Sequence, residues 1–262
     1  MARHAMSKVS LIVPVYNAEP WIDECMASIR AQTYKDIELI VIDDPQASGA
    51  AAARNRGLKK ATGEYVAFCD ADDYLAPDGI ERMVAAMQGV DFVAASFRKF
   101  GEFDAVVTHP EAVLEKNEVA HYVMGNLKEP RHNQLLSGCW AKLYKKSLVG
   151  RFPDLTTAED MAFNFDYLMR CRKVRFIPEI VYHNRKRQGS LSTFFDADKK
   201  SGLFGFLGGL KYVETFLYSH GREWGVDDAL DNSKAYHACL YFMRICDQNG
   251  GTMRENLMRL YP

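Results

Sequence analysis

The clearest hydrophobic pattern in the chain is an apolar run that ends abruptly in three carboxylates. Residues 65–69 have the sequence Tyr-Val-Ala-Phe-Cys, which is typical of a buried strand because aromatic and β-branched side chains favour strands. Asp70, Asp72 and Asp73 follow this run. In an open α/β sheet, ligands bind just beyond the carboxyl ends of the strands, so these acids are predicted to lie at a ligand site.

Two more strands are predicted upstream of this run. Residues 9–17 form an apolar run that leads into a loop, and residues 37–44 form a second run that also ends in acids. Between them, residues 21–31 carry apolar side chains at helical spacing. This order implies parallel strands joined by a right-handed crossover. We therefore expect the strands that end at Asp44 and Asp70 to be parallel neighbours, with their acids on one edge.

The acidic cluster has two interpretations. Three carboxylates this close repel one another, and a hard divalent cation would relieve that repulsion. Mg²⁺ and Mn²⁺ favour oxygen ligands and are often bound by one or two carboxylates together with substrate phosphates. Alternatively, the acids form a solvated turn that caps a helix starting near Pro77. The residues alone leave both interpretations open.

The patterns are weaker in the rest of the chain. They predict a helix over 78–88, a strand over 91–96, a helix near 118–127 and a helix that opens at about residue 157. Residues 195–262 have helical patterns with a broad apolar face. This face could pack on the preceding domain, on a second subunit in a homo-oligomer, or on a membrane surface, and packing on the domain is favoured.

Composition limits the class of protein. A chain of 262 residues with 48% hydrophobic residues can form one large domain, and its net charge of −1 gives no electrostatic reason to expect nucleic acid as a partner. The six cysteines form no Cys-x-x-Cys pair, which suits a reducing compartment better than a disulfide framework or a zinc site. No signal peptide or membrane span is recognised. A cytoplasmic protein is predicted, with contact at the inner face of the membrane as an alternative.

Five motifs in the first third of the chain, taken together and in this order, resemble the family 2 glycosyltransferases of bacterial capsule and lipopolysaccharide type. They are Pro14–Asn17, Gln32–Glu38, Val41–Asp44, Ala52–Asn55, and Thr62–Tyr65 followed by Asp70–Asp73. The close resemblance covers residues 8–80, and looser matches continue to about residue 192.

The resemblance implies an α/β chain with the GT-A fold, a Rossmann-like and mostly parallel sheet flanked by helices. It implies a nucleotide-sugar-binding half at 8–96 and an acceptor-binding half of the same domain at 97–194. Residues 195–262 would be a helical C-terminal extension.

The resemblance also implies the residues of the donor site. Asp72 would be the ligand of a divalent metal, Mn²⁺ or Mg²⁺, while Asp70 contacts the ribose and Ala71 lies between them. The residues around the nucleobase would be Pro14, Tyr16, Asp44 and Arg54. For Tyr16 and Arg54 the alternatives are an ordinary loop aromatic and a surface cation.

Two arginines are predicted to reach the diphosphate. The segment from residue 177 to residue 192 resembles the family's Tyr-Tyr-Tyr-Arg-x-Arg-x-x-Ser-Ile, and it contains Arg185 and Arg187 before Gly189. Guanidinium groups match phosphate oxygens in geometry and charge. A solvated basic loop is the alternative.

Three residues are predicted on the acceptor side. The resemblance implies that Asp160 is the general base, with Glu159 beside it. Thr157 and Asp160 also have the spacing of a capping box, so Asp160 could simply cap its helix. Trp140, within a segment similar to the family's Asn-Lys-Leu-Tyr region, could stack on a sugar face or belong to the core.

One departure from the family pattern is large. The family usually continues after the second strand with Asp-Asp-Gly-Ser-Thr-Asp, a helix and a third strand before Ala-Arg-Asn. Here residues 43–49 lead almost directly into Ala50. The shortening would remove part of the base-binding wall and expose a new sheet edge.

The sequence therefore supports two main hypotheses. The first is an inverting glycosyltransferase that moves a sugar from a nucleotide-sugar donor, with UDP favoured, to a hydroxyl of a saccharide or lipid-linked acceptor. The second is a degenerate, non-catalytic nucleotide-binding or assembly protein of the same fold. A sugar-nucleotide-synthesising nucleotidyltransferase would need a Gly-rich basic loop after the first strand, and residues 14–17 do not provide one.

Overall fold

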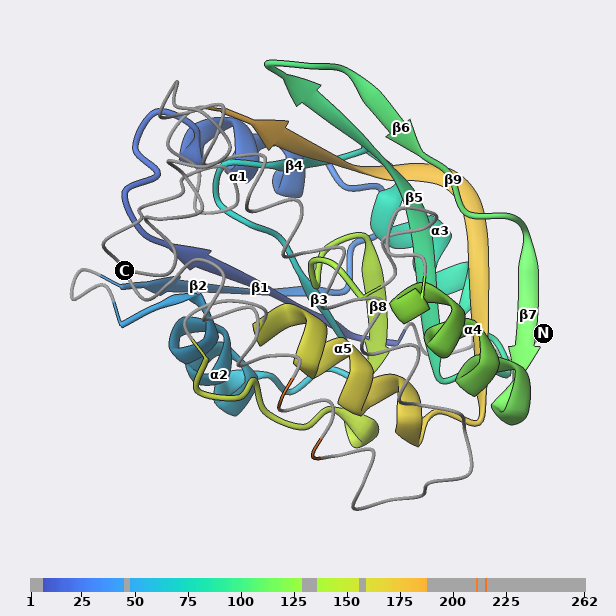
Figure 1. Cartoon of the computed structure of the whole chain (residues 1–262). Coiled ribbons are helices and arrows are strands. Elements are labelled where there is room, and N and C mark those ends of the chain that lie inside the picture. The colour runs from blue at the N-terminus through green and yellow to red at the C-terminus, as the bar shows by residue number, and fades with distance from the viewer. Residues whose placement is uncertain are drawn as a thin grey trace, which may run out of the picture.

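The structure is a computed structural model that describes residues 7–44, 48–128, 136–155 and 159–187, together with Lys211 and Thr215. Within these residues the chain forms a mixed α/β fold around one sheet (Figure 1). The expected α/β architecture is confirmed. Apart from Lys211 and Thr215, the predicted extension at 195–262 lies outside the described residues, as do the packing, membrane and oligomer expectations attached to it.

The N-terminal part of the sheet is parallel. Its elements are β1 (Val9–Val15), α1 (Ile22–Arg30), β2 (Ile37–Asp43), α2 (Ala50–Lys60) and β3 (Tyr65–Phe68). β1 pairs in parallel with β2 on one side and with β3 on the other. The expectation that β2 and β3 are neighbours was therefore wrong. Because all three strands run in one direction, Asp44 and Asp70 still lie at the same edge of the sheet.

The rest of the sheet is mixed. Its elements are β4 (Tyr74–Leu75), α3 (Gly79–Ala86), β5 (Phe92–Gly101), β6 (Ala105–Val107), β7 (Ala112–Glu115), α4 (Lys116–Lys128), β8 (Lys142–Lys145), the 3₁₀ helix η1 (Lys146–Leu148), α5 (Glu159–Arg170) and β9 (Lys173–Lys186). The strand order is β2-β1-β3-β8-β5-β9-β4, with β6 on β5 and β7 on β9. β8 pairs antiparallel with both β3 and β5, so it joins the two predicted halves in one sheet.

Alternate side chains of β1 point into two different cores. Ile12 belongs to the core beneath α2 and α5, whereas Leu11 and Val13 belong to the core that includes α1 and α3. This alternation follows from the two-residue period of a strand, and it explains why β1 is apolar at every position except Ser10. The predicted helices at 78–88 and 118–127 are confirmed as α3 and α4, and the predicted strand at 91–96 extends to Gly101 as β5.

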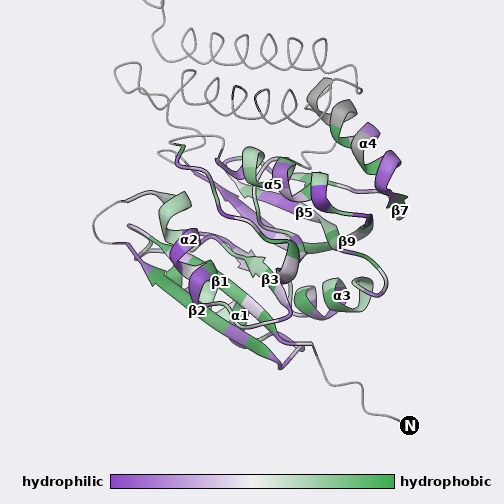
Figure 2. Cartoon of the chain, turned by 90° about the horizontal axis from the view of Figure 1, so that it is seen from below, coloured by the Kyte–Doolittle hydropathy of each residue, from purple (hydrophilic) through white to green (hydrophobic). Residues whose placement is uncertain are grey.

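β2 lies at the edge of the sheet, where the shortened segment after Asp44 predicted an exposed edge. It pairs only with β1 in the described part of the chain. The side chains of Leu39 and Val41 remain 42% and 44% exposed. Figure 2 shows this hydrophobic strand on the outside of the molecule. The exposed edge predicted from the sequence is thus confirmed.

Two further expectations can be compared with the structure. Cys25, Cys69, Cys139 and Cys171 are unpaired and buried, in agreement with packed thiols, and the other two cysteines lie outside the described residues. None of the helices in the described part of the chain has both the length and the hydrophobicity needed to cross a membrane.

Helix α2 approaches β1 closely at Gly57. A Cβ atom built on Gly57 would lie 2.4 Å from Cγ2 of Ile12, so only glycine fits at this contact. Cγ2 is attached directly to Cβ of a β-branched residue and cannot swing away easily. The position of α2, and with it the direction of every side chain on this helix, depends on that contact.

We predict that Gly57→Ala destabilises the fold by about 1 kcal/mol. Overpacking lowers the free energy of unfolding by about 1–3 kcal/mol, and the better helix propensity of alanine offsets about 1 kcal/mol of this loss. Urea denaturation measures the change, with Lys60→Ala at the exposed end of α2 as control. A more stable Gly57→Ala variant would show that helix propensity outweighs the contact with Ile12.

Candidate active site

The centre of the candidate site is Arg54, a cation on α2 that is only 4% exposed. Its guanidinium group lies 2.9 Å from a carboxylate oxygen of Asp70, 3.1 Å from Glu159 and 2.8 Å from Asp160. Asp70 follows β3, whereas Glu159 and Asp160 open α5. One side chain therefore joins the predicted donor loop to the predicted general base, although these segments lie about ninety residues apart in the sequence.

The charges of this cluster do not balance. Three carboxylates surround one guanidinium group, and the buried Nε atom of Arg54 has no hydrogen-bond partner among the described residues. Burial and the charge of Asp160 raise the pKa of Glu159 to about 7, and the guanidinium of Arg54 opposes this shift. Burial also raises the pKa of Asp160, again against the effect of Arg54. The cluster therefore favours the arrival of a proton or a second cation.

Asp73 braces the acidic loop instead of facing the site. It is 2% exposed, and it accepts hydrogen bonds from the hydroxyl of Tyr182 at 2.7 Å, from Nδ2 of Asn184 at 2.9 Å and from the backbone N–H of Arg185 at 2.6 Å. All three donors belong to β9. Burial, together with the charges of Asp70 and Asp72, raises the pKa of Asp73 to about 8. This carboxyl group ties the loop after β3 to the far side of the sheet.

Asp72 lies next to both predicted phosphate-binding arginines. Its carboxylate is 3.1 Å from the guanidinium of Arg187, and its carbonyl oxygen accepts a hydrogen bond of 2.9 Å from Nε of Arg185. Burial and the charge of Asp70 raise the pKa of Asp72, while Arg187 opposes the shift. The structure thus brings both arginines to the acidic loop.

Aromatic and acidic side chains hold these two arginines in place. Arg187 lies over the ring of Trp21, with its Cζ 4.1 Å from the ring centroid. Arg185 lies 4.5 Å from the ring centroid of Phe100 and pairs with Glu24. A guanidinium group stacked on an aromatic ring keeps its N–H donors at the ring edge, where they can bind a carboxylate or a phosphate.

The remaining carboxylates suit a divalent cation. Since Asp73 is occupied by β9, Asp70 and Asp72 are the two acids of the loop that can offer oxygen atoms to a metal. No group of three or more His, Cys, Asp or Glu side chains is positioned to hold an ion within the described residues. Mg²⁺ and Mn²⁺ are commonly held by one or two carboxylates, with substrate phosphates and water completing the shell, so this pair fits such an ion.

Asp44 lies at the same edge of the sheet but has other partners. It is 4% exposed, pairs with Arg56 at 2.6 Å and accepts a hydrogen bond of 3.1 Å from the backbone N–H of Gly49. The hydrogen bond from Ser48 and the charge of Arg56 lower the pKa of Asp44. Among the residues predicted to surround the base, Asp44 and Arg54 therefore belong to separate ion-pair groups.

The other predicted residues lie outside these ion-pair groups. Pro14 belongs to β1, Tyr16 follows that strand and is 51% exposed, and Ala71 is buried in the loop after β3. Trp140 is 8% exposed and stacks on Tyr182 with ring centroids 5.1 Å apart. Little of the Trp140 ring is therefore open to a sugar in this structure, and its acceptor role stays a prediction.

Sequence reasoning missed Lys142 near the site. It is only 3% exposed, and its ammonium group donates hydrogen bonds to the carbonyl oxygens of Gly138 at 2.8 Å and Ser137 at 3.2 Å. Burial lowers the pKa of Lys142 to about 8. The sequence signals are a lysine between apolar residues and the similarity of the 137–145 segment to the family's Asn-Lys-Leu-Tyr region. Neither signal predicts that the cation is buried.

Comparison with known proteins gives a family match. The model of the family described as "Glycosyl transferase family 2" matches residues 10–48 and 44–150. The two matched stretches overlap at residues 44–48, the segment that is shorter than the family pattern described above. A curated relative, "Uncharacterized glycosyltransferase EpsJ" of Bacillus subtilis, is 31% identical over 70% of this chain and 62% of its own length. "Glycosyltransferase GlyA" of Streptococcus pneumoniae is 29% identical over 71% of this chain and 31% of its own length. The chain thus spans less than two thirds of these two relatives.

Solved structures share the fold. S. aureus TarS, residues 1–349 in complex with UDP-GlcNAc, has a TM-score of 0.64 and 20% identity over 90% of this chain and 73% of its own. The mannosyltransferase PcManGT from Pyrobaculum calidifontis, in complex with GDP-Man and Mn²⁺, has a TM-score of 0.59 and 16% identity over 95% of this chain and 77% of its own. The expected GT-A fold is therefore confirmed.

We predict that Arg54→Met costs about 3–5 kcal/mol of stability, because it leaves three carboxylates around an uncompensated buried site. Arg56→Met on the same helix should cost less than about 1 kcal/mol, since the Arg56 side chain is 42% exposed and its ion pair is screened by solvent. Urea denaturation at neutral pH compares the two variants. Equal losses would contradict the central structural role given to Arg54.

Proposed function

The chain belongs to glycosyl transferase family 2, and on that premise we propose that it transfers a sugar from a nucleotide-diphosphate sugar to an acceptor hydroxyl in a single, inverting displacement. The observation that carries this proposal is the contact of Arg54 with both Asp70 and Asp160. A donor-binding loop and a general base must lie within a few ångströms of each other for direct displacement. One guanidinium group spans the distance between them here.

The donor would lie across the loop after β3. Asp70 would contact the ribose, and Arg185 and Arg187 would bind the diphosphate by exchanging their present partners for phosphate oxygens. Asp72, with Asp70, would hold a divalent cation, which supplies neutralising charge for the departing nucleoside diphosphate. UDP is the favoured nucleotide of the donor, and the presence of UDP-GlcNAc in the TarS complex supports this choice.

Asp160 has the surroundings that a general base needs. Its side chain is 21% exposed, so an acceptor hydroxyl can reach it. Burial raises its pKa above the usual value for aspartate, which strengthens the carboxylate as a base, and the charge of Arg54 opposes this shift. In the proposed step the carboxylate of Asp160 accepts the hydroxyl proton while the acceptor oxygen attacks the anomeric carbon. The acceptor would be a saccharide or a lipid-linked saccharide, with Glu159 beside it.

A non-catalytic nucleotide-binding protein is the second candidate. The observations that favour it are the shortened segment after Asp44 and the exposed edge at β2, because both reduce the wall beside the base. The intact acid cluster around Arg54 favours the enzyme instead, since a protein that only binds nucleotide has no use for a buried base on the acceptor side.

We predict that Asp160→Asn lowers the rate of sugar transfer by about 10²- to 10⁴-fold, the range that general-base catalysis contributes. Asparagine can still cap α5, so the melting temperature should change little. In the wild type, transfer should fall as pH drops through the raised pKa of Asp160, because the protonated carboxyl cannot accept a proton. Nucleotide-sugar turnover across a pH series measures both effects.

Glu159→Gln is the matched control. It removes the charge of the neighbouring carboxylate that also pairs with Arg54, and it leaves the carboxylate of Asp160 in place. An Asp160→Asn variant that transfers sugar at the wild-type rate would show that Asp160 is not the base and has a structural role alone. A protein with no transfer activity toward any nucleotide sugar in a broad panel, but with intact nucleotide binding, would favour the second candidate function.

We predict that Asp72→Ala abolishes the Mn²⁺-dependent part of UDP binding and changes stability little, because Asp72 is partly exposed and borders the loop. Calorimetry with UDP, in the presence and absence of Mn²⁺, measures the effect. Asp78→Ala, which removes an exposed carboxylate from the start of α3, is the control. Equal Mn²⁺-dependent affinities for wild type and Asp72→Ala would remove Asp72 from the metal site.

A further inference from the structure

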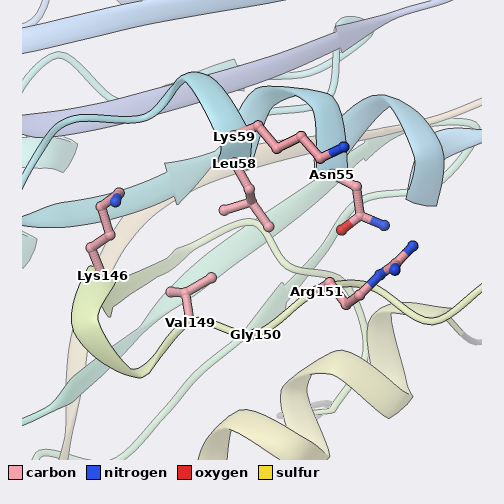
Figure 3. A pocket seen from close by; sticks show the side chains of 7 residues that line it. All are labelled: Asn55, Leu58, Lys59, Lys146, Val149, Gly150 and Arg151. Carbon is pink, nitrogen blue, oxygen red and sulfur yellow. The ribbon is translucent and has the colours of Figure 1, made fainter.

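A pocket outside the candidate active site lies between α2 and the segment that follows β8 (Figure 3). It has a volume of about 280 Å³. It is lined by Asn55, Leu58, Lys59, Lys146, Val149, Gly150 and Arg151. None of the residues assigned above to the donor, the metal or the acceptor belongs to this lining.

Three cations line this pocket. Lys59 comes from the last turn of α2, Lys146 from the start of η1, and Arg151 from the loop after η1. In Figure 3, Lys59 and Arg151 reach toward Asn55, and Lys146 lies at the other end of the cavity. Within the described residues, no side chain forms an ion pair or hydrogen bond with any of the three.

The concentration of positive charge is local. The whole chain has a net charge of −1, so these cations do not reflect an excess of positive charge in the chain as a whole. No acidic residue lines the pocket. Three like charges around one small cavity repel each other, and an anion in the cavity would convert that repulsion into attraction.

The walls of the pocket are held rigidly. Nδ2 of Asn55 donates to the carbonyl oxygen of Phe152 at 2.9 Å, and the backbone N–H of Phe152 donates back to Oδ1 of Asn55 at 2.9 Å. Arg170 also donates to the carbonyl oxygen of Leu148 at 3.0 Å. The loop with Arg151 is thereby fixed to α2 on one side and to α5 on the other. A preorganised site loses little conformational entropy when a ligand binds.

The size and chemistry of the lining indicate the class of ligand. Leu58 and Val149 face each other between the cations and form an apolar floor. The volume is slightly below the usual range for drug-sized ligands, so it fits a small group. The ammonium group of Lys59 and the guanidinium fork of Arg151, which reach toward the same end of the cavity, suit the several oxygens of a phosphate better than a single carboxylate.

We propose that this pocket is a second anion site, in which Lys59 and Arg151 bind a phosphate group at the end of the cavity beside Asn55. The phosphate comes either from a free phosphate ester or from a lipid headgroup, which offer the same chemistry to the cations. The site does not depend on the proposed sugar transfer, because it uses no residue of that reaction.

The test uses inorganic phosphate and the full chain. Calorimetry at low ionic strength should detect phosphate binding that weakens as salt is added. Lys59→Gln and Arg151→Gln should each weaken this binding about tenfold, since a hydrogen bond to a charged group contributes about that factor. Lys60→Gln, which changes the neighbouring exposed lysine outside the pocket, should weaken it no more than about twofold.

A second arm separates the two sources of phosphate. Sedimentation with phosphatidylglycerol vesicles, and with phosphatidylcholine vesicles as control, measures binding to a lipid headgroup. Capture by the anionic vesicles alone that is lost in Lys59→Gln supports a headgroup ligand, whereas binding of inorganic phosphate without vesicle capture supports a free ester. The proposal is overturned if neither probe binds in a Lys59-dependent way, or if Lys60→Gln has the same effect as Lys59→Gln.

Discussion

The structure depends most on the burial of one positive charge. A guanidinium group as enclosed as that of Arg54 is tolerated only when carboxylates satisfy it, and the three that do so come from the loop after β3 and from the start of α5. Neither segment can shift without leaving charge unpaired in a poorly solvated place. Gly57 sets the depth of α2 on β1, and this depth places Arg54 within reach of both segments. Packing and electrostatics thus constrain the same helix.

A second connection complements the first from the other side of the acidic loop. Asp73 accepts three hydrogen bonds from β9, so the loop is fixed between α2 and β9. Asp70 and Asp72 are left on the surface that faces the proposed donor. The three acids of the loop therefore have different partners: Asp70 pairs with the buried Arg54, Asp72 pairs with Arg187, and Asp73 anchors the loop to β9.

Features of the fold that depend on neighbouring residues in the sequence could be predicted from it. The apolar run at 65–69, the spacing within 78–88 and the shortened segment after Asp44 each predicted a feature that the structure contains. The hydrogen bonds of Asp73 with β9 and the ion pairs of Arg54 with α5 span about a hundred residues, and no local pattern encodes such partners. The predicted strand order was wrong for the same reason. Any of the three apolar strands could have occupied the middle of the parallel part, and the central position of β1 is set by packing on both of its faces.

The arginines next to the acidic loop have a consequence for donor affinity. Arg185 and Arg187 already hold carboxylate, carbonyl and aromatic partners, so a diphosphate that binds them as proposed would have to displace existing interactions before it gains new ones. The binding free energy is then a difference between two sets of charged contacts, and it is smaller than a count of phosphate contacts implies. An exchange of this kind also runs easily in reverse, because the protein's own groups replace the phosphates as they leave. In the proposed reaction, product release would be assisted from within the site, and donor affinity would be lower in exchange for faster turnover.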